Sequence, residues 1–132
     1  MNAFLVELEN KPGALAAAAE AIAAKGINIL GISGTSCDDG GRVAIMTADD
    51  AAARTALQDK KISFKELEAT EVALRHEPGT LAKAARRLAE AGVNIEAIMP
   101  TGMTGNDISV AFVTDNATKA REALATVSTG AR

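Results

Sequence analysis

The chain has 132 residues, of which 48% are apolar and 23% charged, with a formal charge of −3 and a pI near 5.2. This composition is typical of a globular protein, and its acidic balance argues against a nucleic-acid partner, which usually meets a clustered basic face. No apolar run approaches the roughly 20 residues of a membrane span, and one cysteine with one histidine cannot form a Cys/His zinc cage. We therefore expect no membrane partner, metal or cofactor. Because residues 1–4 lack the basic and apolar segments of an export signal, we also expect a cytoplasmic location.

The first elements in the chain are a strand and a helix. Alternating apolar side chains predict a strand over residues 4–9. The helix that follows is predicted to have Pro12 in its first turn and to end at Gly26, a left-handed stop. Its expected buried face consists of Leu15, Ala19 and Ile22.

Two strands, a helix and a closing strand are predicted next. Their ranges are 27–33, 42–47, 50–57 and 62–69, with a Gly/Asp-rich turn at 37–41 between the first two.

The second half of the chain repeats the first. Pro78-Gly79 follows Pro12-Gly13 by 66 residues, and Gly-Val-Asn-Ile at 92–95 follows Gly-Ile-Asn-Ile at 26–29 by the same shift. The chain is therefore a tandem duplication. The corresponding predicted elements are strands at 71–75, 93–99 and 108–114, a helix from 81 to a stop at Gly92, and a helix at 117–125.

The element order predicts the fold class. A βαββαβ order implies α+β architecture: two tandem ferredoxin-like units, residues 1–69 and 70–132, each an antiparallel sheet with its helices on one face. The counterpart of strand 62–69 falls at 129–132, so the last strand of the second unit should be short, missing or supplied from elsewhere. Units of about 60 residues bury only about 60% of their unfolded surface, so we expect them to pair, and we expect a homodimer.

Two features occur in both halves and have two interpretations each. Glycine after Pro12 or Pro78 permits a tight turn, but it also lets a ligand approach the N–H groups of the first helical turn, which attract a carboxylate or phosphate. Asn28 and Asn94 begin the second strands, where an amide either caps a turn or serves both the carboxylate and the ammonium of an amino acid. The residue types alone leave both interpretations open.

The paired motifs of the two halves resemble a known family. "ENKPGAL" with "AKGINIL", repeated as "RHEPGTL" with "EAGVNIE" in a βαββαβ frame, resembles the ACT domain family of small-molecule-binding regulatory modules. The resemblance covers nearly the whole chain, as two tandem ACT repeats without an attached catalytic domain. It implies a ligand, commonly an amino acid, bound at interfaces between ACT units. The site residues that it implies are Asn10, Lys11, Pro12, Gly13, Ala14, Leu15, Ile27, Asn28 and Ile29, and in the second half His76, Glu77, Pro78, Gly79, Thr80, Leu81, Val93, Asn94 and Ile95.

The resemblance does not select one ligand. The serine-sensing ACT domains of phosphoglycerate dehydrogenase look similar at Asn10 and Asn28, but they carry a histidine where this chain has Leu8. In the second half, His76 and Glu77 replace Asn10 and Lys11, so the two sites need not be equivalent. "GVNIEAIMPTG" followed by "ISVAFV" also resembles the ACT repeats that regulate aspartate kinases. Branched-chain, aromatic and aspartate-family amino acids all stay open as ligands.

Catalysis finds little support in the residue types. His76 and Cys37 are far apart in the sequence, and the acidic neighbours Asp38 and Asp39 disfavour a reactive thiolate, so we expect no enzyme activity. The alternative that stays open is a regulatory subunit or assembly module acting on a separate amino-acid metabolic enzyme, with no ligand of its own.

An RNA-binding sheet of the same topology is also disfavoured. Such sheets stack bases on exposed aromatic side chains, whereas this chain has no tyrosine or tryptophan. Its three phenylalanines, Phe4, Phe64 and Phe112, are expected in the core.

Overall fold

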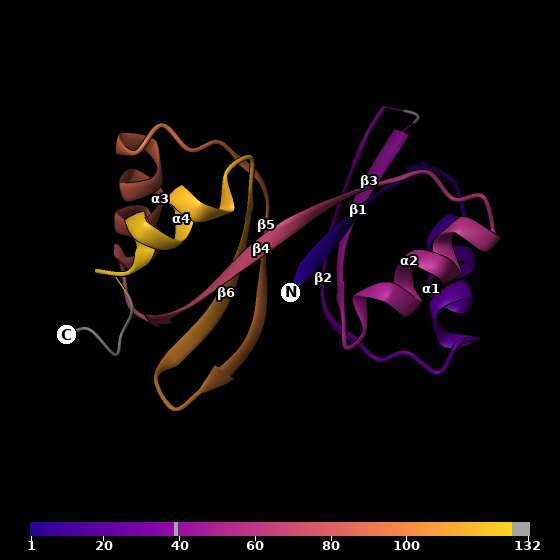
Figure 1. Ribbon diagram of the computed structural model, residues 1–132, viewed down its shortest axis with the longest axis horizontal. Coiled ribbons are helices and arrows are strands. Elements are labelled where there is room, and N and C mark those ends of the chain that lie inside the picture. Colours follow the sequence, from indigo (N-terminus) through magenta and orange to yellow (C-terminus); the bar gives the residue numbers. More distant parts are fainter. Residues whose placement is uncertain (39, 128–132) are drawn as a thin grey trace. The chain divides into compact units, whose positions relative to one another are not determined.

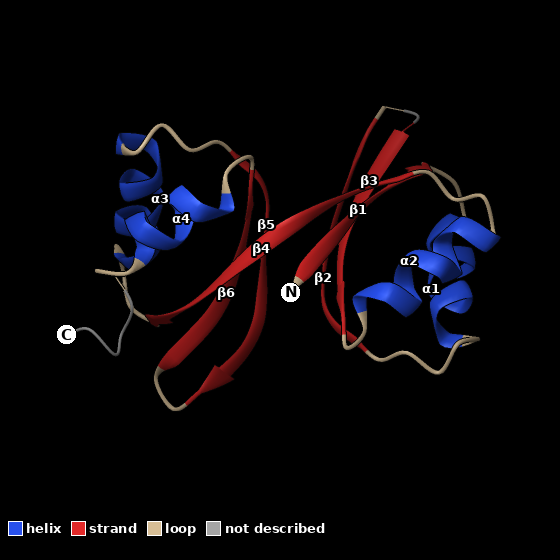
Figure 2. Cartoon of the chain, viewed as in Figure 1, coloured by secondary structure: helices blue, strands red, loops and turns tan. Residues whose placement is uncertain are grey.

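The protein is described here by a computed structural model of residues 1–38 and 40–127. The chain divides into two compact units, Met1–Leu67 and a second that starts at Glu68 (Figure 1). Each has antiparallel strands with its helices on one face, so the predicted α+β, tandem ferredoxin-like class is confirmed (Figure 2). The strand considered at residues 129–132 lies outside the described residues.

The first unit follows the predicted element order. Its sheet has the strand order β2-β3-β1-β4, and α1 and α2 pack on one face. The pairs Val6↔Val43 and Ile32↔Ile45 fix the register of the antiparallel strands. The elements are β1 Asn2–Glu9, α1 Ala14–Ala23, β2 Ile29–Cys37, β3 Gly40–Thr47, α2 Asp50–Asp59 and β4 Phe64–Arg75.

The second unit repeats this arrangement with the strand order β4-β6-β5. The pairs Val72↔Val110 and Ile98↔Phe112 correspond to those of the first unit. Its elements beyond β4 are α3 Thr80–Glu90, β5 Ile95–Thr104, β6 Asp107–Thr114 and α4 Ala117–Leu124.

Strand β4 differs from the sequence expectation. The patterns at 62–69 and 71–75 predict two strands, but the chain forms one strand of 12 residues. Only Thr70 separates the two predicted strands, and no glycine, proline or asparagine interrupts residues 64–75. Because Thr70 is β-branched, it favours extended backbone. The strand also begins later than predicted, because Ile62 N–H still bonds to Leu57 O at 3.0 Å and Lys61 has φ 55°.

The helices lie on their sheets through small side chains. The fully buried helical residues include Ala18, Ala53, Ala84 and Ala120, all with 0% exposure. In the first unit they cover a core of Phe4, Val6, Ile22, Val43, Ile45 and Leu57, and in the second a core of Val72, Leu74, Leu88, Val110, Phe112 and Leu124. Phe4 and Phe112 are fully buried, and the Phe64 ring packs edge-on against Phe4 at a centroid distance of 5.5 Å. The expectation of phenylalanines in the core is therefore confirmed.

One prediction about helix α1 is wrong. Leu15 is 47% exposed, and its counterpart Leu81 in α3 is 50% exposed. Each lies on the helix face that turns toward the sheet, but in the first turn, where the helix has not yet reached the buried part of the core. The side chains that α1 buries are Ala18, Ala21 and Ile22.

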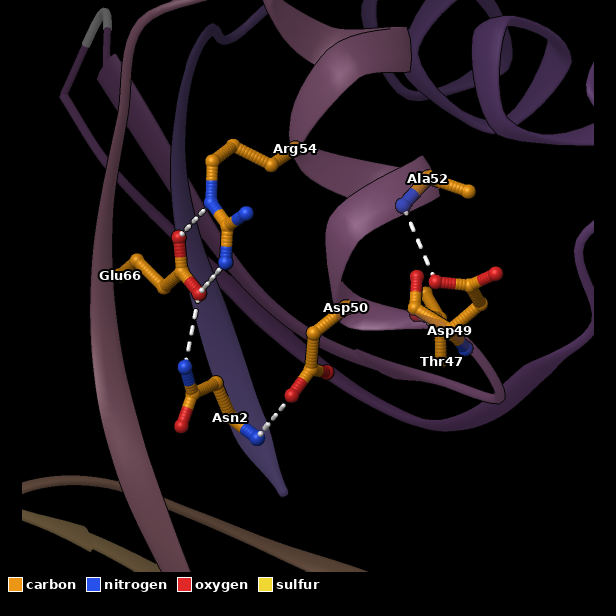
Figure 3. Close-up of polar contacts among 7 residues, drawn as sticks. All are labelled: Asn2, Thr47, Asp49, Asp50, Ala52, Arg54 and Glu66. Carbon is orange, nitrogen blue, oxygen red and sulfur yellow. Dashed lines mark hydrogen bonds and ion pairs between the residues drawn. The ribbon is translucent and has the colours of Figure 1, made fainter.

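A polar network joins β1, α2 and β4 within the first unit (Figure 3). The guanidinium of Arg54 donates two hydrogen bonds of 2.7 Å to the Glu66 carboxylate, which also accepts one of 2.7 Å from Asn2 Nδ2. The Asn2 N–H donates to Asp50 Oδ2 at 3.0 Å. Hydrogen bonding from Arg54 lowers the pKa of Glu66, and this effect outweighs the partial burial that opposes it. The network holds the start of β1 against β4.

The network makes a testable contribution to stability. Because the pKa of Glu66 is lower in the folded protein, its stabilisation is complete above the ordinary glutamate pKa and is lost as the pH falls through the folded value. Glu66→Gln should lower the melting temperature by a few degrees near neutral pH, and this difference should shrink as the pH approaches the acid range. Thermal melts of both proteins across that range would test this.

The second unit supplies a matched control. Arg121 corresponds to Arg54, and it pairs with Glu68 in a more exposed position. Exposed ion pairs contribute little to stability, so Glu68→Gln should change the melting temperature less than Glu66→Gln does. If Glu66→Gln lowered the melting temperature by the same amount at every pH, the stabilisation could not come from the ionised Glu66 carboxylate.

Candidate functional site

The loop between β1 and α1 is a tight turn built on Pro12 and Gly13. The N–H of Ala14 donates to Lys11 O at 3.3 Å, and Gly13 has φ 90° and ψ −13°. These are the angles of the third residue of a type II turn, which takes proline at the second position and glycine at the third. Pro12 therefore precedes the helix, and its predicted place in the first helical turn is wrong. Gly13 is the N-cap, and α1 begins at Ala14.

The loop between β4 and α3 repeats this turn. Thr80 N–H donates to Glu77 O at 3.5 Å, and Gly79 has φ 92° and ψ −14°. Neither α1 nor α3 has a side-chain cap at its first turn. The duplicated Pro-Gly is thus explained by turn chemistry, and the same turn leaves the first helical N–H groups without a capping side chain.

A pocket opens in the first unit because α1 is shorter than the hairpin beneath it. The ten residues of α1 span about 15 Å, whereas the nine residues of β2 span about 30 Å. The end of the hairpin therefore extends past the first turn of α1. The space between them is a pocket of about 480 Å³, a size usual for small-molecule sites. It is lined by residues 8–11, 14–15, 32–36 and 41–43.

The floor of this pocket is the helix-facing side of the sheet. Ile32 pairs with Ile45 and Gly34 pairs with Val43, and directly paired residues share one face. Ile45 and Val43 belong to the buried core under the helices, so Ile32 and Gly34 lie on that face beyond the reach of α1. Ile32 is accordingly 44% exposed.

The charged side chains at the pocket are paired. Lys11 Nζ lies 3.0 Å from Glu9 Oε2, and the Arg42 guanidinium donates to Glu7 Oε1 at 3.3 Å. All four side chains are exposed, so each pair is weak, but each cation has an anion beside it. The pocket therefore presents no uncompensated charge among these groups.

Asn10 connects the loop to the hairpin. Its Nδ2 donates to the backbone oxygen of Asp38 at 3.0 Å, and Asp38 has φ 56° in the hairpin turn. Among the described residues the amide oxygen of Asn10 accepts no hydrogen bond, and Asn10 lines the pocket. In the second unit the corresponding link is a backbone bond, from His76 N–H to Asn106 O at 2.7 Å.

The site residues implied at the start of β2 lie at the other end of α1. Asn28 is exposed and stands just before β2, about one helix length from the pocket, and its backbone oxygen accepts from Ala48 N–H at 3.0 Å. Within the described part of the chain its side-chain amide makes no hydrogen bond. In the second unit, the backbone oxygen of Asn94 likewise accepts, from Asp115 N–H at 3.1 Å. Asn94 also donates from Nδ2 to Glu96 at 2.7 Å and from its N–H to Asp115 Oδ1 at 3.0 Å.

In each unit, the implied site residues thus lie at the two ends of the first helix. In the first unit, four line the pocket (Asn10, Lys11, Ala14 and Leu15), two form the turn (Pro12 and Gly13), and three lie beyond the end of α1 (Ile27, Asn28 and Ile29). In the second unit, His76, Glu77, Pro78 and Gly79 form the loop, Thr80 and Leu81 begin α3, and Val93, Asn94 and Ile95 lie beyond the end of α3. Val93 is 6% exposed and belongs to the core.

The hairpin side of the pocket is absent from the sequence-based site. Residues 32–36 and 41–43 line it, although the second strand was predicted to end at 33. The run of small residues in "GISGTS" is the signal that could have identified them, since small side chains on an edge strand leave space for a ligand. Strand β2 in fact continues to Cys37.

The other chemistry-bearing residues do not gather into a centre. Cys37 is exposed at the end of β2, and His76 is exposed in the loop before α3. Across residues 1–38 and 40–127, no three His, Cys, Asp or Glu side chains are grouped so that they could hold a metal ion. In the same ranges every helix is too short or too polar to cross a bilayer.

The sequence matches the family described as an ACT domain pair over residues 1–128. The chain belongs to this family. The match spans both units, so the predicted tandem ACT architecture is confirmed. A search of curated proteins with the sequence of this chain found no match.

Solved structures share the fold of this ACT domain pair. A protein from Bacteroides thetaiotaomicron is 27% identical with a TM-score of 0.79, and the match covers 94% of this chain and 85% of the other. The ligand-free regulatory subunit of aspartate kinase from Thermus thermophilus is 24% identical with a TM-score of 0.66, over 96% and 88% of the two chains. The corresponding subunit from Thermus flavus is 22% identical with a TM-score of 0.66 over the same shares.

The turn geometry of this ACT domain pair predicts the effect of a glycine substitution. An alanine at position 13 or 79 would meet no atom within 4 Å but would be held at φ near 90°. Left-handed backbone costs a residue with a Cβ about 1–2 kcal/mol, so Gly13→Ala and Gly79→Ala should each destabilise the protein by about that amount. Urea unfolding would measure it. Gly40→Ala is the control, because Gly40 has no positive φ and only an ordinary contact at 3.8 Å. A loss in the control equal to that in Gly13→Ala would contradict the turn assignment.

Proposed function

We propose that this protein is a cytoplasmic amino-acid-binding regulatory protein that responds to its ligand by altered assembly or domain apposition. The observation that carries the proposal is the pocket at the β1–α1 loop, which four of the residues implied by the ACT resemblance line. Membership in the ACT domain pair family supports a regulatory role rather than a catalytic one. We take residues 1–69 and 70–132 as the two repeats.

The chemistry of the pocket suits an amino acid. The first turn of α1, which reaches the pocket at Ala14 and Leu15, has no side-chain cap, so its N–H groups and the helix dipole favour a carboxylate. The amide oxygen of Asn10 can accept from an ammonium group. Leu15 and Ile32 offer exposed apolar surface to a side chain. A ligand of this size needs only about 4–8 kcal/mol of binding free energy, roughly millimolar to micromolar affinity.

The position of Asn28 suggests that ligand binding involves two copies of the chain. Because Asn28 and the β1–α1 loop lie at opposite ends of α1, one unit cannot place both on a small ligand. We propose that a second copy of the chain supplies one of the two groups, so that the ligand contacts both copies and stabilises a homodimer. Ligand binding then shifts the assembly equilibrium by its differential affinity for the paired state.

A ligand screen tests this function. Melting temperatures should rise with a specific member of the twenty amino acids at up to about millimolar concentration, because a ligand that binds only the folded state stabilises it. Asn10→Ala should weaken calorimetric binding by a factor of several, since it removes a group at the pocket. Asn28→Ala should weaken binding and also ligand-dependent dimerisation, measured by analytical ultracentrifugation.

The outcomes separate the parts of the proposal. Asn94→Ala is the matched variant in the second unit, where residues 76–79 form the equivalent loop. If no amino acid raises the melting temperature, the sensing function is wrong. If Asn28→Ala retains both wild-type binding and wild-type association, the second-copy contribution is wrong.

A second candidate function is a regulatory subunit or assembly module for a separate enzyme of amino-acid metabolism. It is favoured by the fold shared with solved regulatory subunits of aspartate kinase. Affinity-tagged protein should then retain a specific enzyme on purification from its own cells. Recovery of the protein alone, together with an amino-acid response, would favour the free-standing sensor.

A further inference from the structure

The two units expose the same pair of apolar side chains near the end of the hairpin, one on the helix and one on the sheet. Leu15 and Ile32 are 47% and 44% exposed in the first unit. Their counterparts 66 residues later, Leu81 and Ile98, are 50% and 37% exposed. The register repeats as well, because Ile32 pairs with Ile45 and Ile98 pairs with Phe112. Any difference in ligand binding between the units must therefore come from other positions.

The floor next to Ile32 and next to Ile98 differs between the units. Gly34 pairs with Val43, and the corresponding pair in the second unit is Pro100↔Val110. A Cβ at Gly34 would lie 3.2 Å from Val43 Cγ2, so the open floor depends on glycine. Pro100 places a ring at the equivalent position of β5, two residues from Ile98 and on the same face. The register of β5 also shifts between Pro100 and Gly102, where β2 continues regularly from Gly34 to Cys37.

The start of the helix above the floor is also bulkier in the second unit. Ala14 lines the pocket of the first unit. Its counterpart Thr80 is larger, and its Oγ1 is engaged with the backbone oxygens of Arg75 and Glu77 at 2.7 and 3.2 Å. The second unit thus has a bulkier floor and a bulkier helix start.

The charge at the first pocket restricts the ligand. Lys11 and Arg42 are each neutralised by a neighbouring glutamate, so a ligand with a net charge would find no unpaired partner among them. Leu15, Ile32 and Val43 form the aliphatic part of the lining, beside the small polar side chains of Ser33, Thr35 and Ser36. A zwitterion with a branched aliphatic side chain matches both properties.

We propose that Gly34 makes the first unit the ligand-binding unit, that Pro100 and Thr80 close the equivalent place in the second, and that the ligand is a branched aliphatic amino acid. This rests on the proposed function and adds to it which pocket binds and what class of side chain it accepts. Gly34 is a specificity-determining position because it has no side chain, and the space that a side chain would fill stays open to the ligand.

The test uses the full chain with methyl-labelled Leu, Ile and Val and follows their NMR signals. L-Valine, L-leucine and L-isoleucine are the probes, and L-lysine and L-aspartate are the charged comparators. The aliphatic probes should shift the methyl signals of Leu15, Ile32 and Val43 and leave those of Leu81, Ile98 and Val110 unchanged. The charged comparators should shift neither set at the same concentration.

Matched substitutions then test the floor. Gly34→Val should raise the Kd by about tenfold or more, and the smaller Gly34→Ala should raise it by a lesser factor. Pro100→Val, at the equivalent position of the second unit, should leave the Kd within about twofold of wild type. Melting curves without ligand report whether each variant folds. If Gly34→Val does not fold, the affinity of Gly34→Ala tests the inference instead.

Each contrary outcome has a distinct meaning. Shifts confined to Leu81, Ile98 and Val110, unchanged affinity in both Gly34 variants, or preference for a charged probe would overturn the inference while leaving amino-acid sensing intact. If none of the twenty amino acids binds the wild-type chain, the proposed function fails and the inference fails with it.

Discussion

The close approach of alanine-faced helices to the sheets is the constraint on which both units depend. A unit of about 60 residues has little apolar surface to bury, so its few large core side chains must be covered without gaps. Ala18 and Ala53 in the first unit, and Ala84 and Ala120 in the second, are fully buried, and their small side chains let each helix lie close to its sheet. The large side chains of the core, such as Phe4 and Phe112, come mainly from the strands.

This packing also determines which part of the sheet the helices leave uncovered. A helix that lies flat on the sheet covers only about 15 Å of it, whereas the strands of the hairpin are about twice as long. The uncovered end of the hairpin meets the type II turn that starts α1, and the pocket lies between them. Leu15 is exposed for the same reason that the pocket exists: the first turn of the helix extends past the buried core.

The duplication preserves backbone geometry more closely than side-chain chemistry. Gly13 and Gly79 have nearly identical left-handed angles, and both hairpins pair in corresponding registers around Ile32 and Ile98. The side chains on this common frame differ, with Gly34 replaced by Pro100 in the second unit. A repeated backbone can therefore hold two loops of different capacity, since turns depend on backbone angles and pockets depend on side-chain volume.

The sequence by itself determined the duplication, the element order, the α+β class and the turn chemistry, because these follow from local periodicity and from residues such as Gly13 that set backbone angles. Asn10 and Leu15, which the family resemblance implies as site residues, line one side of the pocket. Only the tertiary structure decided that 64–75 is one strand, that Asn28 lies a helix length away from Asn10, and that Ile32 and Gly34 form the floor. These features depend on which elements extend past which others, and local patterns in a sequence carry no information about that overlap.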